Sequence, residues 1–108
     1  MRLRHASSPE IMKATPQLKW LRLPAYGLYY VDSLEQSARG DYSCDIVPTF
    51  HSRFDAAAQQ SILKALAWAA EGDVFDWEEV LPGLPHSGDF KRQHCRITRD
   101  RILRLLAT

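Results

Sequence analysis

A regular apolar stripe between Ser52 and Glu71 constrains the fold of this chain more than any other feature. At about 100° per residue its apolar residues share one helical face, and they are Ala58, Ile62, Leu66 and Ala69. Ser52 and Asp55 have a spacing typical of a capping box at a helix start, and Gly72 is suited to a helix end. We therefore predict a helix over Ser52–Glu71 whose apolar face packs against the rest of the molecule.

The length and composition indicate one ordinary globular domain. The chain has 108 residues, of which 45% are hydrophobic and 25% are charged. This length supports one hydrophobic core but not two, and the composition is not that of a disordered or disulfide-dense chain. We therefore predict a single domain over residues 1–108.

The chain ahead of the predicted helix contains segments with the composition of β-strands. Leu28–Val31 is rich in aromatic and branched residues, and side chains alternate between two faces along Asp41–Val47. Because a two-stranded ribbon is only marginally stable alone, a helix must cover one of its faces. We predict an α+β fold, mostly helical, in which a small antiparallel sheet packs on Ser52–Glu71. A mainly helical fold is the alternative.

Capping residues and prolines indicate further helices. We predict short helices over about Pro9–Ala14, Pro16–Leu21 and Asp76–Val80. A last helix is expected to begin at Thr98, which would act as its N-cap. Its apolar residues should face the core and its arginines the solvent, with Ile102, Leu105 and Leu106 inward and Arg101 and Arg104 outward.

The balance of charges gives no long-range field that would attract a polyanion, since the formal net charge is +1. The longest unbroken apolar run, Ala65–Ala70, is far too short to span a membrane. The basic N-terminal segment lacks the apolar core of a signal peptide. We therefore predict a cytoplasmic protein with no membrane partner, in which Cys44 and Cys95 are free thiols.

The histidine and cysteine residues raise the question of a metal or catalytic site. Cys44 and His51 flank a proline, and His94 is adjacent to Cys95, so neither pair has the spacing of a zinc site. Residues as close as His94 and Cys95 seldom adopt the geometry of proton transfer, and the sequence has no nucleophile elbow or phosphate loop. We predict no catalytic residue, metal, cofactor or small-molecule substrate, with Cys44 buried in a strand and His94 on a solvated loop.

The segment Glu71–Glu79 carries five acidic residues, no basic one, and the aromatic pair Phe75 and Trp77. In one interpretation Phe75 and Val80 enter the core while the acids cap a short helix, whose dipole favours them. In the other, the segment is an anionic surface centred on an exposed Trp77 and complementary to a basic groove of another protein. The second interpretation predicts a partner-binding site formed by Asp73, Asp76, Trp77, Glu78 and Glu79. This surface could be extended by Tyr26, Tyr29 and Tyr30.

Three consecutive motifs within residues 62–87 carry a family resemblance, namely Leu66–Ala69, Phe75–Trp77 and Leu81–Ser87. This helix, aromatic and acidic turn, and Leu-Pro stop are similar to the C-terminal half of small bacterial immunity proteins from contact-dependent growth inhibition and related toxin systems. The resemblance implies a non-catalytic, cytoplasmic inhibitor that binds its cognate toxin and occludes the toxin's active site. A nuclease is one candidate toxin, because an acidic surface can occupy the site where a nuclease expects phosphates.

Basic residues near both ends of the chain support an alternative function, a small regulator that binds nucleic acid. No aromatic-interleaved basic strand or recognition-helix pattern accompanies them, so nucleic acid is the less favoured partner. These residues are Arg2, Arg4, His5, Lys13, Lys19 and Arg22 near the N-terminus, and Lys91, Arg92, Arg96, Arg99, Arg101 and Arg104 near the C-terminus.

Overall fold

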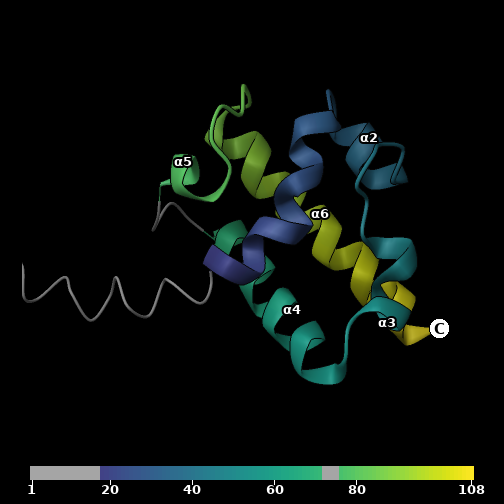
Figure 1. Ribbon diagram of the computed structural model, residues 1–108. Helices are drawn as coiled ribbons and strands as arrows, with labels where there is room; N and C mark the ends of the chain where they lie inside the picture. The colour runs from purple at the N-terminus through teal and green to yellow at the C-terminus, as the bar shows by residue number, and fades with distance from the viewer. Residues whose placement is uncertain (1–17, 72–75) are drawn as a thin grey trace, which may run out of the picture.

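The computed structural model describes residues 18–71 and 76–108, and helices account for 76% of the described residues. Figure 1 shows these helices folded around the longest one, α6. Along the chain the elements are helical residues 18–25, η1 (Tyr26–Tyr30), α2 (Leu34–Arg39), η2 (Val47–Thr49), α3 (Phe50–Arg53), α4 (Ala56–Glu71), α5 (Trp77–Val80) and α6 (Gly88–Ala107).

The core lies where α4 and α6 pack against each other, running in opposite directions (Figure 1). Side chains from the N-terminal half complete it, and the large apolar residues with no exposed surface include Leu21, Leu28, Phe50, Ile62, Leu66 and Ile102. Burial of each such side chain stabilises the fold by about 1.5–3 kcal/mol. The predicted apolar face of residues 58–69 is therefore confirmed, although Ala58 at its start is only half-buried.

No sheet forms in the described part of the chain, so the predicted α+β fold is wrong and the mainly helical alternative is right. Most of the first predicted strand lies in the 3-10 helix η1, which buries Gly27 and Leu28 and leaves its tyrosines outside. The second predicted strand, Asp41–Val47, is irregular because Cys44 adopts a left-handed backbone conformation with φ of 68°. A strand needs extended residues throughout, and Cys44 interrupts them.

The predicted helix over Ser52–Glu71 is divided in two by an extended residue, Phe54. α4 begins after Asp55, whose Oδ1 accepts a hydrogen bond from the backbone N–H of Ala58 at 2.8 Å. Asp55 is therefore the N-cap of α4, and the capping box predicted at Ser52 is wrong. Ser52 instead lies within α3.

The last helix is longer than predicted. α6 begins after Ser87, whose Oγ accepts a hydrogen bond from the backbone N–H of Phe90 at 3.1 Å. Thr98, the predicted cap, lies in the middle of α6 and is 1% exposed. Ile102 is buried as expected, but Arg101 does not point to solvent, since its guanidinium pairs with a buried carboxylate.

The remaining helix predictions have mixed outcomes. α5 forms as expected, with Asp76 as its N-cap. The predicted helix Pro16–Leu21 is present in its described part and continues to residue 25, whereas Pro9–Ala14 lies outside the described residues. Across the described ranges, no helix combines the length and the apolar character needed to cross a membrane.

Candidate functional site

The predicted acidic site centres on α5, and most of its carboxylates are exposed. Asp76 caps the helix by accepting a hydrogen bond from the backbone N–H of Glu78 at 3.0 Å. The Glu78 carboxylate accepts from the backbone N–H of Gly83, with both oxygens at 3.3 Å, and the Glu79 side chain is exposed. Asp73 lies outside the described residues.

Trp77 is not the exposed anchor that the anionic-surface interpretation expected. It is 7% exposed and belongs to the hydrophobic core. The Lys91 ammonium lies 5.6 Å from the centroid of its ring, a distance typical of a cation–π contact. Val80 is also buried. Among the described residues, Trp77 and Val80 therefore enter the core while Asp76, Glu78 and Glu79 remain at the surface, and Phe75 lies outside the described residues.

Arg22 connects this segment to the N-terminal helical residues. Its guanidinium donates to the backbone carbonyls of Glu79 at 2.9 Å and Val80 at 3.0 Å. These are the carbonyls at the C-terminal end of α5, which a short helix cannot satisfy internally. Arg22 therefore holds the backbone of α5 in place, and this contact does not involve the side-chain carboxylates of α5.

An exposed group of aromatic rings lies beside α5, and we call Tyr26, Tyr29 and Tyr30 the tyrosine patch. Their exposed fractions are 42%, 38% and 46%, which makes them the most exposed large aromatic side chains among the described residues. The ring of Tyr26 lies 5.2 Å from that of Tyr29 and 6.1 Å from that of Tyr30 between centroids. Residues three apart in a 3-10 helix lie on one side, so η1 brings the rings together.

The tyrosine patch is fixed to the loop that follows α5. The Tyr29 hydroxyl donates to the backbone carbonyl of Pro82 at 2.5 Å. On the buried side of η1, a side chain at Gly27 would collide with the ring of Tyr42, so only glycine permits this approach. The tyrosine patch and the α5 carboxylates thus lie on elements that are joined by the hydrogen bond between Tyr29 and Pro82.

A shallow apolar hollow of about 260 Å³ adjoins the tyrosine patch. It is lined by Lys19, Arg22, Leu23 and Tyr26. A hollow of this volume can hold one large side chain of another protein, and interfaces often concentrate their binding energy in such pockets. Sequence reasoning missed the hollow because the predicted helix ended at Leu21, whereas the helix continues to residue 25 and η1 follows it, so helical spacing brings residues 19, 22 and 26 to one side.

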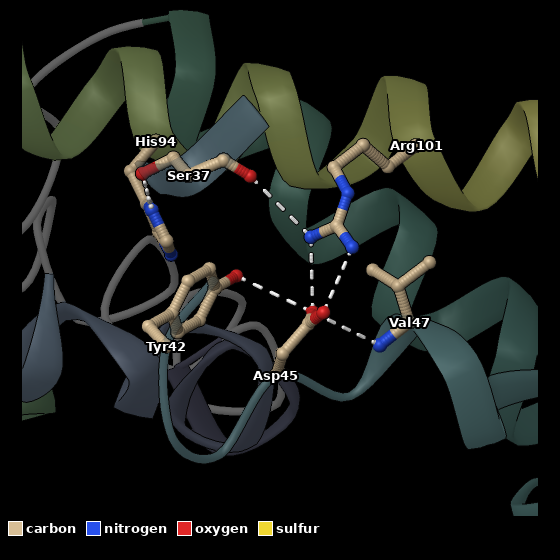
Figure 2. A network of polar contacts seen from close by, with 6 residues as sticks. All are labelled: Ser37, Tyr42, Asp45, Val47, His94 and Arg101. Carbon is tan, nitrogen blue, oxygen red and sulfur yellow. Dashed lines mark hydrogen bonds and ion pairs between the residues drawn. The ribbon is translucent and has the colours of Figure 1, made fainter. Parts of the chain in front are cut away.

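A second polar cluster lies between α2, the 41–46 loop and α6, and Figure 2 shows it in detail. Arg101 donates two hydrogen bonds to the Asp45 carboxylate, at 2.8 and 3.0 Å, and the two side chains are 12% and 6% exposed. Asp45 also accepts from the Tyr42 hydroxyl at 3.4 Å and from the backbone N–H of Val47 at 3.2 Å. This network fastens an irregular loop to the longest helix.

The same cluster contains a serine–histidine pair that the sequence did not predict. The Ser37 hydroxyl and His94 Nδ1 are 2.7 Å apart, although 57 positions separate the residues. Burial is the main cause that lowers the pKa of His94 to about 4, and electrostatic interactions with His86 and Arg101 lower it further. Both side chains have no exposed surface, so a substrate cannot reach this pair. Its role is to hold α2 against α6.

The other histidine and cysteine predictions are corrected or refined. Cys44 is exposed and lies in a turn, and His94 is buried in α6, so both of their predicted environments are wrong. Cys95 is fully buried, which raises the pKa of its thiol to about 12 and keeps it protonated. His86 Nε2 lies 2.8 Å from the backbone carbonyl of Val31. Within the described ranges, no three His, Cys, Asp or Glu side chains gather as metal ligands.

Several of the basic residues noted in the sequence make contacts within the fold. Arg22 and Arg101 are engaged as described above, and Arg96 donates to the backbone carbonyl of Ala70 at 3.4 Å. Arg99 lies 4.0 Å from the Asp100 carboxylate, and both side chains are partly exposed. The basic residues between 1 and 17 lie outside the described part of the chain.

Comparison of the chain with protein-family profiles, with curated protein sequences and with solved structures finds no match.

Proposed function

We propose that this chain is a non-catalytic protein-binding inhibitor, and specifically an immunity-type protein that binds a toxin and occludes its active site. The observation that carries the proposal is the surface formed by the tyrosine patch and the α5 carboxylates. Tyrosine is a frequent interface residue because its ring buries a large area and its hydroxyl still finds polar partners. An exposed cluster of such rings is unusual on a surface that only faces water.

The chemistry of this surface defines the partner. Asp76, Glu78 and Glu79 attract a basic protein surface, and the adjoining hollow accepts an apolar side chain from it. The binding anchor is thus the tyrosine patch, in place of the buried Trp77. A nuclease is a suitable toxin, because its active site is basic and the carboxylates can take the place of phosphates.

The test uses the protein encoded next to this chain, produced together with it in bacteria. We expect this neighbour to arrest growth when produced alone and this chain to restore growth. In calorimetry with the purified neighbour, Glu78→Lys combined with Glu79→Lys should weaken binding by about tenfold or more, because both attractions become repulsions. The control with the same change of charge is Glu35→Lys combined with Asp41→Lys, two exposed acids whose reversal should leave binding unchanged.

Three results would contradict the proposal. The first is growth arrest that this chain does not relieve, and the second is a neighbour that is harmless. The third is binding that persists in the α5 double variant, with circular dichroism showing the same helix content in all variants.

A further inference from the structure

Two hollows adjoin along the seam between α4 and α6, outside the tyrosine and α5 surface. They share Ala67 and Arg99 as lining residues and have volumes of about 400 and 290 Å³. The first is also lined by Ala70, Glu71, Arg96 and Asp100. The second is also lined by Gln60, Leu63, Lys64 and Leu103. Because the hollows meet at Ala67, whose side chain is only a methyl group, we treat them as one groove.

The second hollow is the cationic part of this groove. Lys64 comes from α4 and Arg99 from α6, so positive charges from two helices line the same space. Among the described residues that line this hollow, none is acidic. The carboxylate of Asp100 lies 4.0 Å from Arg99, but an exposed pair at this distance is worth little and leaves Arg99 able to bind another anion.

Apolar side chains lie beside these cations. Leu103 is 39% exposed, the one large aliphatic residue of the described chain with so much exposed surface, and Leu63 is half-buried. Cations and leucines in one hollow are complementary to a ligand that carries carboxylates and apolar groups together. A small inorganic anion would leave the leucines uncovered.

The shape of the groove favours a helical ligand. Its lining residues on α4 extend from Gln60 to Glu71, which at a rise of 1.5 Å per residue corresponds to about 16 Å. A groove between two helices is a common docking site for an amphipathic helix, which inserts its apolar face between them. About three turns of such a helix would fit along this length.

We propose that the groove between α4 and α6 binds an acidic amphipathic helix of a partner protein. The carboxylates of that helix contact Lys64 and Arg99, and its leucine-like side chains cover Leu63 and Leu103. This site is separate from the surface of the proposed inhibitor function and does not depend on it.

The probe for this proposal is a fluorescein-labelled peptide of about 14 residues with Glu and Leu at helical spacing. Anisotropy titration with the full chain should show saturable binding. Lys64→Glu combined with Arg99→Glu should weaken it by about tenfold or more, and Ala67→Trp should weaken it by filling the groove. The matched control is Arg53→Glu with Arg104→Glu, two exposed arginines outside the groove lining, which should bind as the native chain does.

Each alternative outcome overturns the proposal. These outcomes are no binding, equal binding of a peptide with Gln in place of Glu, or binding that survives the Lys64 and Arg99 reversals in a chain with native helix content. Tighter binding of a single-stranded oligonucleotide of the same charge would make the groove a nucleic-acid site. Self-association that light scattering detects and Ala67→Trp abolishes would make a second copy the occupant.

Discussion

The polar network around Asp45 and the surface around α5 are built from the same kinds of side chain, yet they do opposite things. In the network, the half-buried Tyr42 and the nearly buried Asp45 carboxylate lie with Arg101, and their hydrogen bonds hold one part of the chain to another. On the surface, the tyrosine patch and the α5 carboxylates remain exposed. Burial, and not residue type, decides whether such groups stabilise the fold or are free to bind a partner.

The largest effect is expected where the buried ion pair is broken. Asp45→Ala leaves the Arg101 guanidinium nearly buried without its carboxylate, which should lower the free energy of unfolding by about 3 kcal/mol. Urea titration measures this change. Asp41→Ala is the control, since Asp41 is an exposed acid in the same loop and should cost less than about 0.5 kcal/mol. Equal losses in both variants would mean that burial does not decide how much a carboxylate contributes to stability.

Acid should destabilise the buried network through His94. Burial lowers the pKa of His94 to about 4 from the ordinary value of 6.5. As the pH falls, the imidazole is therefore protonated in the unfolded chain at a higher pH than in the folded chain. The contribution of His94 to stability is therefore complete above about pH 6.5 and is lost as the pH falls towards 4, by about 3 kcal/mol in total. Unfolding midpoints in urea between pH 7 and 4 measure it. In His94→Asn this part of the pH dependence should disappear, and a profile that keeps its slope would contradict the assignment.

Neutralising the exposed carboxylates should have the smallest effect on the fold. Glu78→Gln combined with Glu79→Gln should change the free energy of unfolding by less than about 0.5 kcal/mol, because both side chains are exposed and a glutamine at position 78 keeps an oxygen that can accept from the Gly83 N–H. The same urea titration checks this expectation. A loss as large as that of Asp45→Ala would mean that these carboxylates are structural.

The sequence predicted those parts of the fold that depend on local spacing. The apolar face of α4 and the Asp76 cap of α5 follow from residues close together in the chain. The sheet prediction failed because aromatic enrichment in Leu28–Val31 came from surface tyrosines, and because alternation in Asp41–Val47 did not disclose the left-handed Cys44. Composition does not distinguish a strand face from an exposed side of a 3-10 helix.

The site was predicted only in part, for reasons that involve distant contacts. The position of Trp77 in the core depends on the rest of the fold, and the pairing of Ser37 with His94 joins residues 57 positions apart. Arg101 was expected in solvent because the spacing of residues along one helix gives no information about Asp45, which lies 56 positions away. Each error arose where the environment of a side chain is set by residues far away in the sequence.

The most direct test compares two tyrosines, one from each region, in binding and in stability. Calorimetry with the neighbouring-gene protein should show that Tyr30→Ser weakens binding by about tenfold or more, with an unchanged melting temperature. Tyr42→Phe removes a hydrogen bond to Asp45, so it should lower stability by about 1 kcal/mol and leave the affinity as it is. The reverse pattern, with affinity lost at Tyr42 and preserved at Tyr30, would contradict the assignment of the tyrosine patch as the binding surface.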